Sequence, residues 1–411
     1  MTRLREIGWI SWLLASIFYA YQYILRIMPS MMIPEIMQQF HINATLFGQF
    51  SGVYYLGYSL MHIPMGIMLD RYGPRRVMTG SILLTGIGLL PLIFSHYWAY
   101  PIIGRGLIGI GSSAAILGTF KIIRMTFKEK HFTRMLSIAV TIGLLGAIYG
   151  GAPVSRLFGL WGYTFVIGMF CFSGMILALM TYLLVPELSE AASTSQEQPV
   201  ATQKNSIFKD LNMVFSNYHV ILLCFFAGCM VGPLEGFADI WGAEFLRHYY
   251  GLDPKIANAL PSMIFIGMCF GAPLLSLIAE KTGCYLGSIV GAGMVMTLIF
   301  VLLVAHWLNV QTITLTFLLV GVCSAYQILA IYQASTYVPE HVSGLTTAVA
   351  NMIIMSFGYM LHSLIGLVIH EAGGTAARNS FAYGIGVIPI MLLIGVVGCS
   401  FLLFQDRARK V

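Results

Sequence analysis

Charged residues are scarce in this sequence. Asp, Glu, Lys and Arg make up 9% of its 411 residues, whereas hydrophobic residues make up 58%. A soluble domain carries about a quarter charged residues, because its surface faces water. This chain lacks the charge to cover such a surface. The composition excludes a soluble globular protein and indicates an integral membrane protein.

Motifs for redox, metal and ATP chemistry are also lacking. The seven cysteines fall in apolar segments without a Cys-x-x-Cys pair, which is typical of free buried thiols. There is no Walker A, His-Glu-x-x-His or Gly-x-Ser-x-Gly motif and no cluster of metal ligands. We therefore expect no enzyme activity, no cofactor, no metal and no direct use of ATP. The net charge of +6 fits basic loops at a membrane, so no nucleic-acid partner is expected.

Long apolar runs dominate what is present. A helix needs about 20 apolar residues to cross a bilayer. The first run is too long for a signal-peptide core and has no small-residue cleavage site, so we expect a retained span. The runs predict an all-α membrane protein with twelve transmembrane helices, at residues 7–36, 45–69, 76–95, 98–126, 134–158, 162–186, 217–247, 255–280, 284–306, 310–338, 343–370 and 380–404.

One long polar segment divides these spans into six and six. Residues 187–216 include Glu190–Pro199, whose composition cannot bury a core, and we expect a flexible cytoplasmic linker. The predicted domains are an N-terminal six-helix bundle, 1–186, and a C-terminal six-helix bundle, 217–411. With the N-terminus in the cytoplasm, fifteen Lys and Arg lie in cytoplasmic segments and four on the other side. This bias predicts a multi-pass protein of the inner membrane with both termini cytoplasmic.

The two halves repeat one short pattern. Gly66–Gly73 follows the second span and Ser276–Gly283 follows the eighth, and both read small residue, acid, base, glycine at the same spacing. Two six-helix halves related by repetition describe a secondary transporter whose site lies between them.

Three motifs resemble those of the major facilitator superfamily, over essentially the full chain. Gly66–Arg76 resembles its loop 2–3 motif, Gly-x-x-x-Asp-Arg-x-Gly-x-Arg-Arg. Gly104–Gly111 resembles its fourth-span motif, Arg-x-x-x-Gly-x-Gly, with Ile108 where glutamine is common. Gly143–Pro153 is similar to the glycine-rich fifth-span motif of drug antiporters, but its proline is displaced, which disfavours efflux. The resemblance implies two pseudo-symmetric six-helix bundles and transport by alternating access.

The loop motif is expected to act as a cytoplasmic latch. Asp70 would be stabilised at a helix N-terminus of the opposite half, and Gly73-Pro74 makes a tight turn. The alternative is that the motif is only a topology signal. The resemblance assigns Arg105 a structural or gating role. The predicted gating residues are Gly66, Asp70, Arg71, Gly73, Arg75, Arg105, Glu280 and Lys281.

Arg26 is the leading candidate for substrate contact. An arginine within a span costs at least a few kcal/mol unless it faces water or a partner. Tyr19, Gln22, Tyr23 and Arg26 share one helix face, and a guanidinium flanked by tyrosines suits a carboxylate. The alternative is an arginine that reaches the outer interface. Arg26–Ser30, together with Asn43–Thr45, also resembles the branch that contains lysosomal dipeptide carriers.

Other side chains extend this predicted site. Tyr54 and Tyr58 share a face, whereas Tyr55 is expected to point elsewhere. Lys121 is either a cavity cation, which we favour, or part of a cytoplasmic basic cluster. The predicted substrate-binding residues are Tyr19, Gln22, Tyr23, Arg26, Tyr54, Tyr58, Lys121, Glu235, Tyr326, Gln327 and Gln333.

The seventh span carries two acids, Glu235 and Asp239, four residues apart. The Gly-Pro-x-x-Gly sequence at 232–236 predicts a broken helix. Two facing carboxylates disfavour joint ionisation, which suits proton coupling; alternatively, one binds a substrate amine or Asp239 is merely solvated at the outer interface. His362 is a candidate proton relay, or a hydrogen-bonded packing residue.

The sequence thus predicts a monomeric secondary active transporter in the lipid bilayer, with protons as an optional coupling ion. Its substrate is expected to be a small carboxylate-bearing solute, with an amino acid or short peptide favoured. The alternatives are an organic anion or polycarboxylate such as a siderophore, then drug efflux, and a non-transporting membrane sensor as a different class.

Overall fold

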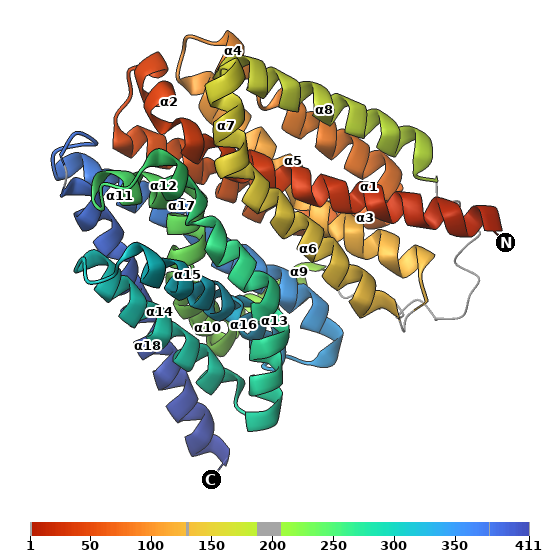
Figure 1. Ribbon diagram of the computed structural model, residues 1–411. Helices are drawn as coiled ribbons and strands as arrows, with labels where there is room; N and C mark the ends of the chain where they lie inside the picture. The colour runs from red at the N-terminus through yellow and green to blue at the C-terminus, as the bar shows by residue number, and fades with distance from the viewer. Residues whose placement is uncertain (1, 129–130, 187–206, 378, 411) are drawn as a thin grey trace.

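The computed structural model describes residues 2–128, 131–186, 207–377 and 379–410. Over those residues the chain forms helices joined by turns, with no strand. The helices of the first half gather on one side of the molecule and those of the second half on the other (Figure 1). The all-helical, two-bundle architecture predicted from the sequence is confirmed.

The helices of the N-terminal half are α1 (Thr2–Ile27), η1 (Met28–Met32), α2 (Ile33–Phe40), α3 (Ala44–Ile87), α4 (Leu90–Phe94), α5 (Ala99–Thr126), α6 (Phe132–Gly150), α7 (Ala152–Trp161) and α8 (Tyr163–Leu184). Those of the C-terminal half are α9 (Ile207–Ser216), α10 (Tyr218–Cys229), η4 (Gly232–Trp241), α11 (Gly242–His248), α12 (Pro254–Ala259), α13 (Ser262–Thr282), α14 (Tyr285–Val304), α15 (Val310–Ser324), α16 (Tyr326–Ser335), α17 (Glu340–Glu371) and α18 (Ser380–Lys410).

Nine helices in the described part of the chain are long and apolar enough to cross a membrane, and a bent pair, Arg134–Gly150 with Ala152–Trp161, makes a tenth. One of the nine, Ala44–Phe94, has 51 residues, more than twice what a crossing needs. It breaks at Gly73, whose φ of 77° and ψ of 160° are not helical, so it accounts for two crossings. The break therefore raises the number of crossings in the described part of the chain from ten to eleven. Helix α1 adds a twelfth, although its tyrosines and Gln22 lower its mean hydropathy. This number agrees with the twelve predicted spans.

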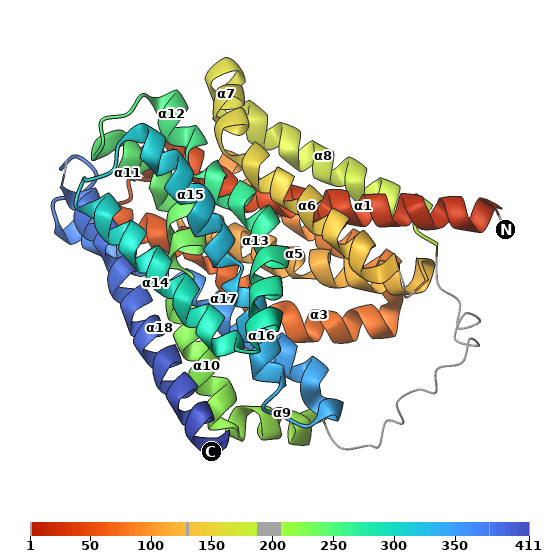
Figure 2. The ribbon, with the colours of Figure 1, turned by 60° about the horizontal axis from the view of Figure 1, so that its bottom comes forward.

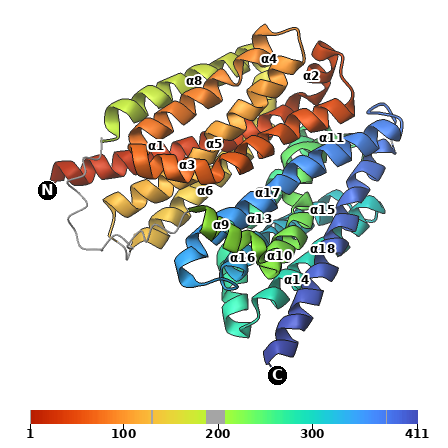
Figure 3. The same ribbon diagram turned by 180° about the vertical axis from the view of Figure 1, so that it is seen from behind.

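The two bundles converge at the end of the molecule that holds α2 and α11 and diverge toward the chain termini (Figures 1 and 2). Helices α3 and α17 run against each other along the contact between the halves, which Figure 3 shows from behind. Glycines make this contact close. A Cβ at Gly48 would lie 2.3 Å from the His362 carbonyl oxygen, and one at Gly366 would lie 2.4 Å from that of Ala44. The converging end is therefore closed by backbone-to-backbone packing.

Two polar contacts in the described structure join the halves at the same end. Asn43 Nδ2, before α3, lies 3.3 Å from His370 Nε2 of α17. The Asn258 side-chain amide of α12 donates to Ser155 Oγ of α7 at 2.8 Å. The polar linker predicted at 187–216 lies mostly outside the described residues. Its last part differs from the expectation, because Ile207–Ser216 forms the helix α9.

Candidate functional site

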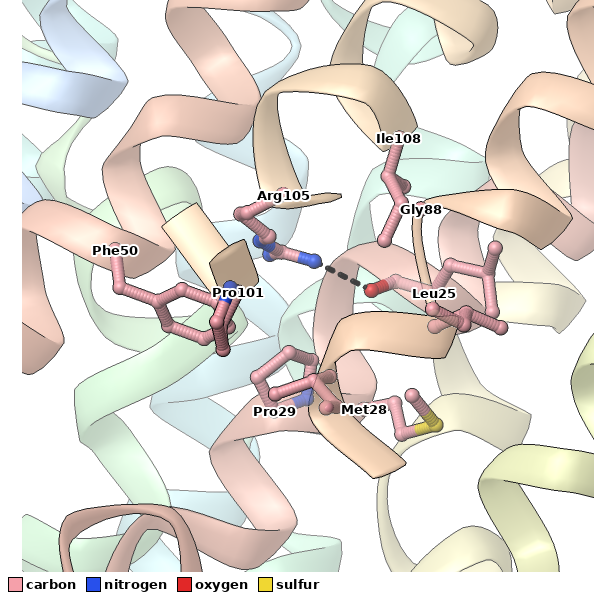
Figure 4. Close-up of a pocket in the computed structure, with 10 residues that line it drawn as sticks. Leu25, Met28, Pro29, Phe50, Gly88, Pro101, Arg105 and Ile108 are labelled. Atoms are coloured by element: carbon pink, nitrogen blue, oxygen red, sulfur yellow. Dashed lines mark hydrogen bonds between the residues drawn. The ribbon is translucent and has the colours of Figure 1, made fainter. Parts of the chain in front are cut away.

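The end of α1 is held by an arginine from α5. The Leu25 carbonyl would normally accept from the N–H of residue 29, but Pro29 has none. Arg105 replaces that donor: its Nη1 donates to the Leu25 carbonyl at 2.7 Å and its Nη2 to the Arg26 carbonyl at 2.7 Å. Figure 4 shows the first of these bonds between Arg105 and Leu25. Arg105, 2% exposed, thus fixes the backbone that carries Arg26.

Arg26 crosses from this anchored turn to the other half of the molecule. Its Nε donates to Asp239 Oδ2 at 2.5 Å, and its Nη2 donates to Glu235 Oε2. The Tyr55 hydroxyl contacts the same two carboxylate oxygens. All three charged side chains are buried. We call Arg26, Tyr55, Glu235 and Asp239 the charged cluster.

The acids of the charged cluster stand on a π-helix. Residues Gly232–Trp241 form η4 between α10 and α11, so the predicted break in this span is present. A π-helix is rare and is frequently found at functional sites. His362 of α17 holds it from behind, with Nε2 2.5 Å from the Glu235 carbonyl oxygen. Because a carbonyl only accepts, His362 Nε2 carries the hydrogen, and this histidine supports the backbone rather than touching either carboxylate.

An aromatic wall adjoins the charged cluster on the N-terminal half. The Tyr54 hydroxyl donates to Gln22 Oε1 at 2.6 Å, and the Tyr54 and Tyr58 rings are stacked 6.1 Å apart. Tyr19 and Tyr23 meet edge to face at 5.3 Å. The Arg26 guanidinium lies 5.1 Å from the centre of the Tyr23 ring. The structure therefore brings together the predicted residues Tyr19, Gln22, Tyr23, Arg26, Tyr54 and Tyr58.

Of the four remaining predicted residues, one lies beside the charged cluster and three do not. Gln327 is buried beside Glu235, as a site residue would be. Tyr326 is also buried, but its hydroxyl donates to the Ala227 carbonyl at 2.7 Å, which is a packing role. Gln333 pairs with Thr336 at the far end of α16. Lys121 was expected near the substrate; instead its Nζ lies 2.7 Å from Asp70 Oδ1.

That ion pair places Asp70 within its own half. Its side chain is 74% exposed, and its partner Lys121 belongs to α5 rather than to a helix of the opposite bundle. Arg71 lies over the Tyr72 ring at 5.4 Å, and Arg75 lies over the Tyr182 ring at 4.5 Å. These contacts all lie within the N-terminal half, at the end where the bundles diverge. The closed latch stays a prediction.

The two repeated loops each hold a glycine with a positive φ. Gly73 has a φ of 77° and Gly283 a φ of 62°, values that other residues rarely adopt. Neither glycine has another atom near the position of an added Cβ. Their role is therefore the turn itself, although the turns differ in ψ, which is 160° at Gly73 and 14° at Gly283. Gly66, Glu280 and Lys281 lie at these loops without a bridge to the opposite half in the described structure.

Sequence reasoning missed two contacts between the halves. Tyr55 was expected to point away from Tyr54, and it does, but toward the acids of the other half. Asn351 Nδ2 lies 3.3 Å from Nε2 of His62, which is also buried. A helical wheel shows which face a residue occupies but not which helix covers that face, so the sequence held no signal for either contact.

Comparison with known families decides the class. The sequence profile of the Major Facilitator Superfamily matches residues 13–363. This chain belongs to the Major Facilitator Superfamily. Members of this superfamily are transporters rather than enzymes.

Relatives within the superfamily differ in what their names state. Methyl viologen resistance protein SmvA of Salmonella typhimurium is 32% identical over 122 residues, 28% of this chain and 24% of that protein. Human protein spinster homolog 1 is 25% identical over 52% of this chain and 41% of that protein. The uncharacterized transporter YybO of Bacillus subtilis is 24% identical over 68% of each chain. The match thus spans about a quarter of SmvA and less than half of the spinster homolog.

Solved structures share the fold. A bacterial homologue of the human lysosomal transporter Spinster, in an inward-facing and unoccupied conformation, aligns with a TM-score of 0.74 at 16% identity, covering 98% of this chain and 97% of that one. A D-xylose–proton symporter aligns with a TM-score of 0.71 at 13% identity, covering 96% of each chain. At these identities the likeness concerns the fold alone.

Proposed function

We propose that this protein is a proton-coupled secondary transporter that moves a small carboxylate-bearing solute, an amino acid or short peptide, across the inner membrane. The observation that carries the proposal is the charged cluster. A guanidinium from the N-terminal half is bound by two carboxylates of the C-terminal half at the level where the bundles meet. Those carboxylates occupy the donors that a substrate carboxylate needs.

Charge balance supports coupling to a proton. Two buried cations, Arg26 and Arg105, lie near two buried acids, Glu235 and Asp239. If both acids are ionised, the four charges cancel. A proton on Glu235 releases an Arg26 donor and leaves one positive charge in excess. A substrate carboxylate neutralises that charge, because an unpaired buried charge is costly.

Tyr55 supports the same exchange. Its hydroxyl carries a single hydrogen but contacts a carboxylate oxygen of both Glu235 and Asp239. Two hydrogen bonds at these contacts require a second hydrogen, which a protonated carboxyl supplies. The two acids then share a proton and titrate as a pair.

Asp239 supports a substrate with an amine. Its Oδ1 is buried and has no hydrogen-bond partner in the described part of the chain. A buried acceptor without a donor is costly, and an ammonium group fits it. A zwitterion would thus place its carboxylate on Arg26 and its amine on Asp239.

The second candidate substrate is an organic anion without an amine. The charge balance of the site favours this anion over a zwitterion. One proton and one monocarboxylate together leave the site neutral, whereas one proton and one zwitterion leave it positive. The two candidates differ in net charge moved. Proton symport of a zwitterion carries current, and that of a monocarboxylate with one proton does not.

The deciding experiment is uptake into proteoliposomes under an imposed proton gradient. We would compare labelled amino acids, dipeptides and monocarboxylates, with current recorded in parallel. The expected result is gradient-driven uptake of one class that is lost in Glu235→Gln. Gradient-driven uptake that persists in Glu235→Gln would reject the proton role. If neither a proton gradient nor a solute gradient moved any of these solutes, the proposed substrate class would be wrong.

A further inference from the structure

A groove lies between α13, α14 and α15, away from the charged cluster. It has a volume of about 530 Å³ and an almost wholly apolar lining, which includes Ile278, Gly291 and Leu319. Ile278 and Leu319 are 43% and 46% exposed. All three helices are membrane spans, so these exposed side chains face the lipid and the groove opens toward it.

Small residues of α14 create the groove. Gly287 and Gly291 are one turn apart on the same face, and both line it. An added Cβ at Gly291 would meet no atom within 4 Å. The groove runs beside α14 from Gly287 to Val295, and so along the helix rather than across it. A long, narrow apolar chain that stands parallel to the helices matches this shape.

A lysine lies next to one end of the groove. Thr282 and Cys284 line it there, at the same end of the bundle as the C-terminus (Figure 1). Lys281 is three residues after Ile278 and therefore shares its helix face, whereas Glu280, two residues after Ile278, lies on the other side. Helix α14 begins here without a side-chain cap, so its first-turn N–H groups are open to an acceptor.

From these features we infer that the groove holds one phospholipid of the bilayer, with an acyl chain between α14 and α13 and an anionic headgroup at Lys281 and the start of α14. The apolar lining accounts for the chain, and Lys281 together with the start of α14 accounts for the headgroup. The inference concerns a lipid site on the outer face of the C-terminal bundle and does not depend on the transported solute.

Photocrosslinking tests this site in the full-length protein. The protein would be reconstituted in nanodiscs that contain phosphatidylglycerol with a photoactivatable diazirine midway along one acyl chain. After irradiation, mass spectrometry would quantify lipid adducts on each transmembrane peptide. Adducts concentrated on residues 274–295 and 319–323 are expected. Adducts spread evenly over all lipid-facing helices would overturn the proposal.

Gly291→Leu fills the groove, and Gly386→Leu is its matched control, because an added Cβ at Gly386 also meets no atom within 4 Å. We expect Gly291→Leu to lower groove adducts about tenfold, because the new side chain displaces roughly two methylene groups of the acyl chain from the groove. Gly386→Leu should leave the adducts unchanged. Thermal unfolding of both variants checks that they fold. Unchanged adducts in folded Gly291→Leu, or protein-to-protein crosslinks from this face, would refute a bound lipid.

The headgroup is tested separately. Repeating the experiment with the phosphatidylcholine analogue should give fewer groove adducts than phosphatidylglycerol does. Lys281→Gln should remove that preference, whereas Lys255→Gln, an exposed lysine on α12, should keep it. An equal preference in Lys281→Gln and in the unmodified protein would refute the assigned headgroup position.

Discussion

Arg26 and Asp239 are 213 residues apart in the chain, yet Nε of the first lies 2.5 Å from Oδ2 of the second. One belongs to the last turn of α1 and the other to η4, so the bond joins the two halves of the transporter. Alternating access moves these halves against each other. In each transport cycle the bond must therefore break, or η4 must move together with the end of α1.

Removing the guanidinium should abolish uptake. Arg26→Ala leaves Glu235 and Asp239 buried without their cation, and breaking a buried pair costs about 3–5 kcal/mol. We expect a lower thermal unfolding midpoint and uptake at background level. Lys255→Ala, at an exposed lysine, should change neither property.

A neutral cluster separates stability from function. The triple variant Arg26→Met, Glu235→Gln, Asp239→Asn removes all three charges, and such replacements are often neutral or stabilising. Its unfolding midpoint should recover to near that of the original protein while uptake stays absent. Uptake by the neutral triple variant would show that these charges do not bind the solute.

Tyr55 offers a finer test of proton handling. Tyr55→Phe keeps the ring that packs on Gly358 but removes the hydroxyl shared by both acids. We expect gradient-driven uptake to fall by about tenfold, the loss of one hydrogen bond to a charged group, with an altered pH profile. Tyr383→Phe, at a tyrosine that is 62% exposed, is the control. An unchanged profile in Tyr55→Phe would remove this hydroxyl from the proposed exchange.

The repeated loop makes a prediction about two glycines in one motif. Gly73→Ala forces a side chain into a positive φ and should destabilise the protein by about 1 kcal/mol. Gly66→Ala lies in helical backbone with no atom within 4 Å of the new Cβ, and should be neutral or stabilising by about 0.5–1 kcal/mol. Thermal unfolding distinguishes them. Gly283→Ala also places a side chain at a positive φ and should destabilise the protein, but less than Gly73→Ala does, because the left-handed conformation of Gly283 is less restricted to glycine than that of Gly73. A Gly73→Ala variant at least as stable as Gly66→Ala would contradict the turn argument.

The glycine contact between the halves should be intolerant of even one methyl group. Gly48→Ala places a Cβ against the His362 carbonyl oxygen, and overpacking of this kind costs about 1–3 kcal/mol. Because α3 and α17 then move apart at the converging end, a cysteine introduced at Ser155 should become more accessible to water-soluble thiol reagents. Its labelling should be faster in the double variant Gly48→Ala, Ser155→Cys than in Ser155→Cys alone. Gly168→Ala, where the new Cβ meets no atom within 4 Å, is the matched control. Equal labelling rates would mean that this contact does not close the converging end.

Much of the fold could be predicted because its signals are local. Runs of about 20 apolar residues mark the spans whatever surrounds them. Both Gly73 and Gly283 occupy turns that require glycine, so the repeat was readable from the motif. Helical spacing correctly placed Tyr54 with Tyr58 and Glu235 with Asp239.

The charged cluster could not be predicted, because the sequence does not show how the two bundles pack against each other. Spacing along α3 shows that Tyr55 and Tyr54 diverge, but only the packing of α3 against the other half brings Tyr55 to Glu235. Spacing along α5 likewise could not decide between a cavity and a cytoplasmic basic cluster for Lys121, and it gave no sign of the contact with Asp70.

The sequence by itself determined a membrane-spanning transporter of two related halves, because hydropathy and turn chemistry act over a few residues. The tertiary structure alone decided that Arg26 is already bound by Glu235 and Asp239, since their meeting follows from how the halves dock. The loop motif of Asp70 names the class, and the contact between α1 and η4 points to the chemistry.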